Sequence, residues 1–277
     1  MAMRSLPLLE VRSHGNLTRE AVQGIRDTLQ ECYLRLGNWL PDRVEVHIFE
    51  TSAQQAAFLD IEKAELGIDT SGDEAFICTH DAWRGYPRLL ISMEKLSTLS
   101  TIAQLGTLRH EAAHTVLHGG LAYYVFRLPP DCLELAGAKG LDQHLLQQLL
   151  YYCAIAVKDF EASRLLVYKG YWDCQLAFVH AQFVPSFEDE LAWLLAKRHP
   201  RVRVLFLAAQ LKPLLLGWPL KQAGLVQVET LADSMLSYLE PGERKRLIAL
   251  AAGIIELLGN DTHENVSAAL RQVLREL

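Results

Sequence analysis

The sequence lacks the features that identify disordered, repeat and nucleic-acid-binding proteins. It carries no low-complexity tract and no repeat at a solenoid period, and 50% of its 277 residues are hydrophobic while 22% are charged. This composition excludes disordered and collagen-like chains. Positive charge is not in excess either, because 27 Lys and Arg face 33 Asp and Glu and the formal net charge is −6. We therefore expect neither nucleic acid nor an anionic membrane as the main partner.

Cysteine is scarce and irregularly spaced. The chain has 5 cysteines, an odd number, and no two of them form a C-x-x-C pair. This pattern indicates a reducing compartment rather than a disulfide framework. Cys78 and Cys153 lie in apolar runs, so we expect buried thiols and not nucleophiles.

Long hydrophobic runs are also missing. A membrane span needs about 20 consecutive apolar residues, but the most apolar late stretches, 204–220 and 247–258, contain Lys212 and Glu256. Residues 1–10 include only a short apolar run, so no signal peptide is expected. We predict a soluble, cytoplasmic protein whose chain is long enough to bury a sizeable core.

Hydrophobic periodicity divides the chain into a front section with strands and a rear section of helices. Before residue 95 the pattern predicts three or four strands and two helices, with the strands at 7–13, 44–49, 75–79 and 88–92 and the helices at 16–36 and 52–65. Further helices are predicted at 102–117 and 141–168, followed by successive helices that break at Pro185, Pro200, residues 216–219, Pro241 and residues 259–261. The predicted fold class is α+β.

The most informative stretch, residues 107–118, reads TLRHEAAHTVLH and contains H-E-x-x-H inside a predicted helix. One helical turn separates His110 from His114, so both imidazoles leave the same face and can hold one metal ion, for which zinc is suited. Glu111 points about 100° around the helix from His110. From there it can take a proton from a metal-bound water without occupying a coordination position. We expect one Zn²⁺, with His110 and His114 as ligands and Glu111 as the catalytic base.

Coincidence is the alternative explanation of this motif. Two histidines and one glutamate at these offsets arise in roughly one random chain of this length in a hundred. The intervening and following residues Ala112, Ala113, Thr115 and Val116 are uncharged, so the helix can be buried. Buried His and Glu side chains are costly without a metal or hydrogen-bond partners, and the pattern therefore favours a metal site.

Residues 107–116 resemble the extended signature of zincin metallopeptidases, since every constrained position of that signature matches. The resemblance implies a zincin-like fold, in which a small N-terminal mixed sheet packs on the motif helix and a mostly helical C-terminal region follows. We place the zincin-like domain at 1–182 and the helical region at 183–277. In zincins an edge strand binds the substrate in extended form, and here Leu89, Leu90 and Ile91 are the candidates.

The third ligand distinguishes the zincin families. Metzincins continue as H-E-x-x-H-x-x-G-x-x-H, but this chain has Leu117 and Gly120 at the last two constrained positions, so it is not a metzincin. His118 lies about 12 Å along a continuous helix from His110 and cannot easily share its ion. We expect a polar residue near the helix C-terminus. A supporting role behind the zinc ligands is the alternative, because H-E-x-x-H-x-x-x-H recurs in ImmA/IrrE-type peptidases.

Gluzincins take their third ligand from a glutamate on a later helix. The Glu-Ala-x-Arg stretch at Glu161 resembles the ligand segment of gluzincins in peptidase family M48 and, loosely, that of the ImmA/IrrE type. The resemblance implies Glu161 as the third zinc ligand. Those families often place an Asp three or four residues later, where this chain has Arg164 and Leu165, so Asp159 is the substitute as supporting acid. Asp159 also competes for the ligand role, because its helical neighbours are equally apolar.

Other polar residues have less specific interpretations. Asp131 and Glu134, in a predicted loop after the motif helix, are weaker alternatives as the third ligand. The basic stretch 197–203 is expected to be a solvated turn between helices. A Tyr or His that donates to the transition state is usual in the zincin superfamily, and four candidates stay open: Tyr123, Tyr168, Tyr171 and His180.

The sequence therefore predicts a zinc-dependent hydrolase of the gluzincin type, with a peptide or protein substrate. The rival interpretation is a non-catalytic module that keeps the metal and acts in regulation or assembly through its helical rear. The intact Glu111 favours the enzyme, because loss of that residue is the simplest way to abolish the chemistry.

Overall fold

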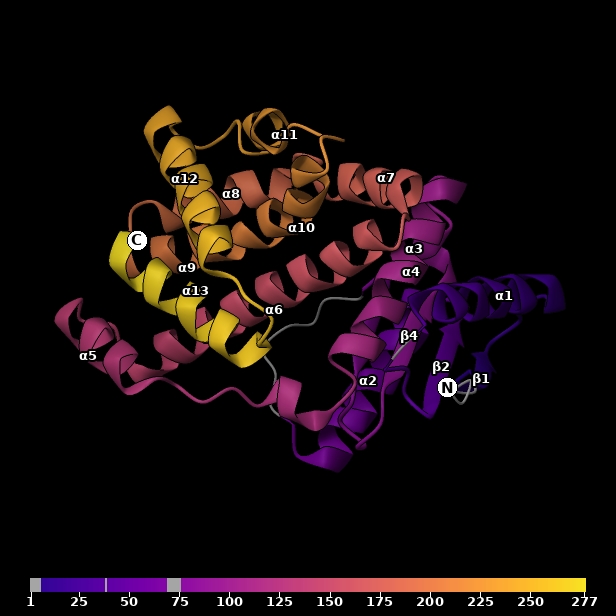
Figure 1. Ribbon diagram of the computed structural model, residues 1–277. Coiled ribbons are helices and arrows are strands. Elements are labelled where there is room, and N and C mark those ends of the chain that lie inside the picture. The colour runs from indigo at the N-terminus through magenta and orange to yellow at the C-terminus, as the bar shows by residue number, and fades with distance from the viewer. Residues whose placement is uncertain (1–5, 38, 69–75) are drawn as a thin grey trace. The chain divides into compact units, whose positions relative to one another are not determined.

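The computed structural model describes residues 6–37, 39–68 and 76–277 (Figure 1). The chain forms two compact units, and both are discontinuous in sequence. The first unit comprises Met1–Tyr124 and Tyr168–Phe178, and the second comprises Val125–Val167 and Val179–Leu277. This division differs from the predicted boundary at residue 182, because most of the predicted 141–168 helix belongs to the second unit.

The first unit is built on a four-stranded mixed sheet with the order β1-β2-β4-β3. β2 is parallel to β1 and to β4, and β3 is antiparallel to β4. The strand bounds are β1 Leu8–His14, β2 Arg43–Phe49, β3 Cys78–Asp81 and β4 Arg88–Ser92. The α+β class, the small mixed sheet and the mostly helical C-terminal region are therefore confirmed. The predicted strand at 75–79 begins later, at Cys78, and Ala75 lies outside the described residues.

The predicted substrate-binding edge strand was wrong. Leu89, Leu90 and Ile91 lie in β4, which pairs with β2 on one side and with β3 on the other. All five residues of β4 are buried, and its backbone groups are used by the two ladders, so it has no edge to which a substrate could be added. Of the described strands, β1 and β3 form the edges of this sheet.

Helices cover both faces of the sheet. The motif helix α4 (Thr101–Leu117) packs against β3, β4 and the helix α1 (Arg19–Leu36), and α2 (Ser52–Leu66) contacts β2 and β4. Tyr33 Oη and Thr115 Oγ1 form a buried hydrogen bond of 2.7 Å between α1 and α4. Leu90 packs with residues of α2, and because side chains alternate along a strand, Leu89 and Ile91 face α4. This covering explains why β4 reads as a nearly continuous apolar run.

A buried ion network connects α2 to the edge strand β3. Arg88 is only 1% exposed, and its Nε and Nη2 donate to the two oxygens of Asp81 at 2.8 and 3.0 Å. Its Nη1 donates to Glu62 Oε2 at 2.7 Å. Hydrogen bonds from Arg84, together with those from Arg88, lower the pKa of Glu62 to about 2. Every carboxylate of this network therefore has a cationic partner.

Gly106 lets a segment of α7 (Trp172–Gln182) pack directly on the motif helix. A Cβ at this position would lie 2.2 Å from the carbonyl oxygen of Cys174 and 2.8 Å from the Cβ of Phe178. Gln175 Nε2 also donates to the carbonyl oxygen of Gly106 at 3.0 Å. Only glycine fits this contact without movement of the backbone.

We therefore expect Gly106→Ala to reduce the free energy of unfolding by about 1–3 kcal/mol, the usual range for overpacking. Gly24→Ala is the matched control, because Gly24 lies in α1 and a Cβ there would meet nothing within 4 Å. That substitution should stabilise the protein by about 0.5–1 kcal/mol. Chemical denaturation of both variants measures the difference, and equal stabilisation by the two would show that the Gly106 contact is not tight.

The second unit is helical throughout its regular elements. It contains α5 and α6, the end of α7, and the helices from α8 to α13. Their bounds are α5 Pro130–Ala138, α6 Gln143–Tyr168, α8 Phe187–Ala196, α9 Pro200–Ala209, α10 Leu211–Gln222, α11 Val228–Met235, α12 Pro241–Leu257 and α13 Thr262–Glu276. Short elements of the first unit are α3 (Met93–Leu96) and the 3₁₀ helix η1 (Leu121–Tyr124). Over the described residues, no helix has both the length and the apolar character needed to cross a bilayer.

Two local predictions for this unit were wrong. Residues 130–138, expected as a loop, form α5, which begins with Pro130 in its first turn. The predicted break at 216–219 is absent, because α10 continues through Pro219. Residues 214–220 are all buried, so tertiary packing outweighs the local preference of proline. The breaks at Pro185, Pro200, Pro241 and residues 259–261 are confirmed.

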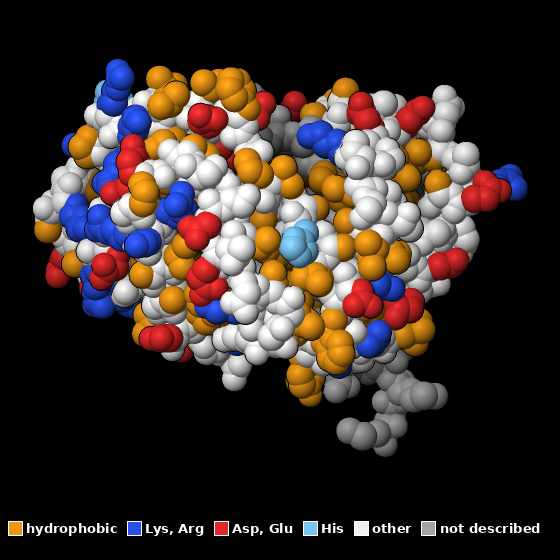
Figure 2. All heavy atoms as spheres, turned by 90° about the horizontal axis from the view of Figure 1, so that it is seen from above, with side chains coloured by type: hydrophobic (Ala, Val, Ile, Leu, Met, Phe, Trp, Pro, Cys, Tyr) orange, Lys and Arg blue, Asp and Glu red, His pale blue; other side chains and the backbone are white. Residues whose placement is uncertain are grey.

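Residues 197–199 of the basic stretch form the turn between α8 and α9, as predicted, and residues 200–203 form the first turn of α9. Three of its cations pair with acids of the same unit: Lys197 with Glu240 at 3.5 Å, Arg201 with Asp142 at 3.7 Å and Arg203 with Glu243 at 2.5 Å. Charged side chains of both signs lie among polar and hydrophobic ones on the molecular face in Figure 2. These pairs offset the positive charge of the stretch, and because they are accessible to water each contributes only about 0–1 kcal/mol.

All five cysteines are free thiols and buried, which confirms the prediction for Cys78 and Cys153. Burial raises the pKa of both thiols. Thiolate nucleophiles need the opposite shift, so these cysteines belong to the core.

Candidate metal centre

The motif residues lie on α4 as the sequence predicts. The helix begins after the N-cap Ser100 and ends at the C-cap His118. His110 is 2% exposed, Glu111 9% and His114 1%. Ala112 and Ala113, both fully buried, let neighbouring elements pack closely on this helix. The helix therefore places three polar side chains inside the protein, where each needs a polar partner or a metal.

The two motif histidines are arranged as a pair of ligands for one ion. Nε2 of His110 and Nε2 of His114 are 3.1 Å apart, and the ring planes are inclined by 82°. The lone pair of an imidazole nitrogen lies in the plane of its ring. An ion that both lone pairs bind must therefore lie where the two ring planes intersect. Two nitrogens bound to a tetrahedral zinc at 2.0–2.1 Å are about 3.3–3.4 Å apart. The pair fits zinc with only a small adjustment.

A short contact joins His118 to the Nδ1 side of the His114 ring. His118 is fully buried, and its Nδ1 lies 3.1 Å from Nδ1 of His114. One of these nitrogens must donate and the other accept. When His114 donates, its Nε2 keeps the lone pair on the side of His110, which is the tautomer that a metal requires. His118 is the C-cap of α4, as expected for a polar residue near the helix C-terminus, and its contact with His114 is also compatible with the supporting role.

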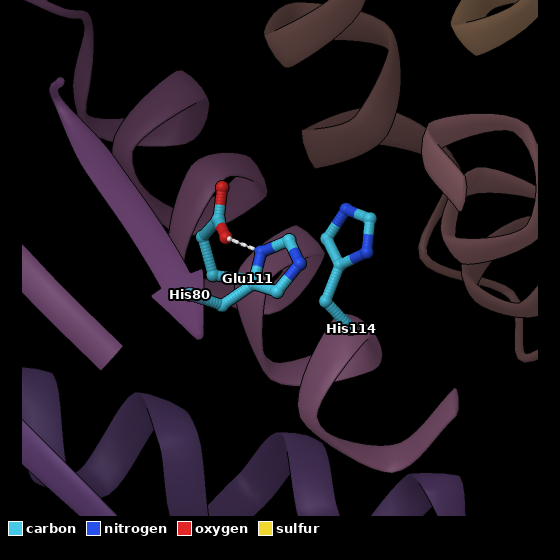
Figure 3. A group of neighbouring side chains, drawn as sticks. All are labelled: His80, Glu111 and His114. Carbon is cyan, nitrogen blue, oxygen red and sulfur yellow. Dashed lines mark hydrogen bonds and ion pairs between the residues drawn. The ribbon is translucent and has the colours of Figure 1, made fainter. Parts of the chain in front are cut away.

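His80 is a site residue that the sequence analysis missed. It lies on the edge strand β3, and its Nδ1 is 2.7 Å from Oε2 of Glu111. Its ring stacks on that of His114 with centroids 3.9 Å apart and planes inclined by 12° (Figure 3). The alternation of side chains along β3 was the available signal, because either Thr79 or His80 must face α4.

His80 is a partner of Glu111 rather than a ligand beside His114. Ligand atoms of His80, Glu111 and His114 lie within 4.8 Å of one another. The rings of His80 and His114, however, are stacked and inclined by only 12°, so their planes meet far from both rings and the two lone pairs do not converge on one nearby ion. The short contact to Glu111 is a charge-assisted hydrogen bond instead.

Two tyrosines of η1 lie near these side chains. The ring of Tyr123 is 5.4 Å from that of His118, and the ring of Tyr124 is 6.3 Å from that of His80. Burial, together with the negative charges of Asp81 and Glu111, raises the pKa of Tyr124. Its hydroxyl therefore stays protonated at neutral pH and can donate a hydrogen bond.

Tyr123 is one of the four predicted donor candidates, and Tyr124 is not. The other three candidates lie in different surroundings. Tyr171 Oη donates to Glu31 Oε1 at 3.0 Å, and the guanidinium groups of Arg35 and Arg109 lie 4.4 and 4.6 Å from its ring centroid. Tyr168 is 83% exposed. His180 is exposed and belongs to the second unit. Tyr123 and Tyr124 are therefore the described tyrosines whose rings lie beside His118 and His80.

The four acids predicted as candidates for the third zinc ligand all lie in the second unit. They differ in the hydrogen bonds and ion pairs that they form within it. Glu161 on α6 accepts hydrogen bonds from Asn265 Nδ2 at 2.6 Å and from Thr262 Oγ1 at 2.8 Å, both on α13. Asp159, also on α6, lies 3.7 Å from Nζ of Lys212. Of the weaker alternatives on α5, Asp131 is bound by Arg271 of α13 and Glu134 is exposed.

Comparison with the models of known protein families, with curated proteins and with solved structures gives no match. A proposal for the function therefore depends on the residues of the site and on the motif that carries them.

Proposed function

We propose that the protein is a zinc-dependent hydrolase that cleaves peptide bonds. The observation that carries the proposal is the pair of Nε2 atoms of His110 and His114, 3.1 Å apart on nearly perpendicular rings. The resemblance of residues 107–116 to the zincin signature and the packing of α4 against a small mixed sheet support it.

The residues of α4 have distinct roles in this reaction. Zinc, when bound, supplies a Lewis acid and lowers the pKa of a coordinated water to about 7. Glu111 accepts the proton of the attacking water as the O–C bond forms. It then passes that proton to the amine nitrogen as the C–N bond breaks, so the leaving group departs neutral. His118 keeps His114 in the tautomer that presents Nε2, and the hydroxyl of Tyr124 is our candidate donor to the substrate carbonyl oxygen.

We expect the purified protein to contain about one equivalent of zinc, and His110→Ala/His114→Ala to abolish it. Elemental analysis of both proteins measures this directly. His144→Ala is the control, because His144 is exposed on α6 and its loss should leave the metal content unchanged. Full zinc occupancy in the double variant would refute the assignment of both ligands.

The gluzincin resemblance implies an acid of α6 as the third zinc ligand, and the two candidates differ in their contacts within the second unit. Glu161 is held by two short hydrogen bonds from α13, so its loss removes interactions inside that unit. We therefore expect Glu161→Ala to lower the stability more and Asp159→Ala to weaken zinc binding more, the reverse of the order that the sequence suggests. The loss in Asp159→Ala should exceed the about 10–100-fold cost of removing a supporting residue.

Zinc titration and chemical denaturation of the same two variants separate these effects. Asp159→Asn and Glu161→Gln are the shape-matched controls, since each keeps the side-chain volume and removes the charge. If Glu161→Gln loses zinc while its stability stays close to the wild-type value, Glu161 is the ligand, as the sequence resemblance implies.

The rival proposal is a zinc-binding module without catalytic activity. The intact Glu111 favours the enzyme, because loss of that residue is the simplest way to abolish the chemistry. A scan of peptide libraries with the zinc-loaded wild type distinguishes the two, since the module cleaves nothing at any pH.

A further inference from the structure

The hydrogen bond between His80 and Glu111 has no part in the roles described above. We propose that His80 is the positioning residue for Glu111, which it holds in the orientation that accepts a proton. This inference rests on the proposed hydrolase function. It concerns a residue that lies 30 positions before the motif on a different element, β3.

The bond itself is short and well placed for this role. Nδ1 of His80 lies 2.7 Å from Oε2 of Glu111, within the range of a strong charge-assisted hydrogen bond. A carboxylate accepts through two oxygens with about four lone-pair sites. One bond from His80 therefore fixes the carboxylate and leaves it the capacity to take a proton.

Two further interactions fix the position of His80, one through its ring and one through the neighbouring residue. Its face stacks on His114 at 3.9 Å between centroids, which restricts rotation about the side-chain bonds. The next residue, Asp81, is bound by two hydrogen bonds from the buried Arg88. The backbone of β3 and the plane of the ring are thus both fixed, so the ring can in turn fix Glu111.

Glu111 needs such a partner because its side chain has three rotatable bonds. A general base acts only within hydrogen-bond reach of the proton that it accepts, and a displacement of about 1 Å can cost about 10²-fold in rate. His80 selects one rotamer of Glu111 before substrate arrives. Its loss should therefore lower kcat and leave KM and the zinc content unchanged.

Two substitutions separate the hydrogen bond from the stacking contact. His80→Phe keeps a ring against His114 but has no N–H, and we expect kcat to fall about 10–100-fold. His80→Asn has no ring but carries an amide N–H at nearly the position of Nδ1, and it should recover part of the loss. Wild-type kcat in His80→Phe would overturn the proposal. Loss of zinc from His80→Phe would also overturn it, because it would make His80 a ligand.

A second measurement does not depend on activity. In the zinc-loaded protein, the ¹⁵N shifts of the His80 ring should show the Nδ1–H tautomer, with the signals assigned by their absence from His80→Asn. Glu111→Ala should return the ring to the Nε2–H tautomer that is usual in solution. An Nε2–H tautomer in the wild type would overturn the pairing. If the wild type cleaves no peptide, the proposed hydrolase fails, and the tautomer still decides whether His80 holds Glu111.

Discussion

Glu111→Gln should lower kcat for peptide hydrolysis by at least about 10²-fold, the usual contribution of a general base. Glutamine keeps the length and shape of the side chain and can still accept a hydrogen bond from His80, but it cannot take a proton from water. The geometry places Glu111 beside His80 and not between the two Nε2 atoms of the ligand pair, so zinc content and stability should match the wild type. Steady-state kinetics, elemental analysis and chemical denaturation measure the three quantities.

Glu134→Gln is the matched control, because Glu134 is exposed on α5 and its neutralisation should change none of the three. Equal cleavage by wild type and Glu111→Gln would identify a contaminating peptidase or a different mechanism. If neither protein cleaves any peptide although both carry zinc, the non-catalytic module becomes the better interpretation.

Arg88→Met should reduce the free energy of unfolding by about 3–5 kcal/mol, as is typical when one partner of a buried ion pair is removed. Arg88 is 1% exposed, and its loss leaves Asp81 at 3% and Glu62 at 7% exposure without this cation. Methionine has a similar volume, so the loss comes mainly from the charge of Asp81, which loses both hydrogen bonds from Arg88, while Glu62 keeps those from Arg84. It does not come from a large cavity. Chemical denaturation measures the change.

Arg84→Met provides the comparison within the same network. The Arg84 side chain is 36% exposed and pairs with Glu62 and Glu65, and a pair so accessible to water contributes about 0–1 kcal/mol. Arg88→Met/Asp81→Leu/Glu62→Leu should recover much of the stability, because well-packed apolar residues can replace a buried ion network. A loss below about 1 kcal/mol in Arg88→Met would show that the network is not effectively buried.

Local patterns were enough to predict most elements of the first unit. The amphipathic spacing of α1, the β-rich run of β2 and the apolar character of α4 depend on residues close in sequence, and their bounds agree with the structure to within a few residues. The motif likewise places His110 and His114 on one face by helical geometry alone. Such features need no knowledge of the rest of the chain.

The features that the sequence did not reveal depend on contacts between distant residues. The sequence predicts β4 as an edge strand, because nothing local shows that β3, which precedes it, pairs on its outer side. His80 was missed for the same reason, since its contact with Glu111 follows from that pairing. The start of α5 did carry a local signal, because Pro130 occupies the first turn, a position that proline favours in helices.

The chain passes from one unit to the other three times, after residues 124, 167 and 178. This affects the order in which the parts of each unit are synthesised. The motif helix is complete at His118, but the segment that packs on Gly106 ends at Phe178, 178 − 118 = 60 residues later. A ribosome that adds about 5–20 residues per second needs roughly 3–12 s to make that interval. During this time the nascent motif helix lacks the part of its cover that α7 supplies, whereas α1 and the sheet have already been made. Fragments that end at residue 124 lack the 168–178 segment of the first unit and should therefore be poor substitutes for the whole chain. Separate production of the two units would require a new linker between 1–124 and 168–178 and another between 125–167 and 179–277.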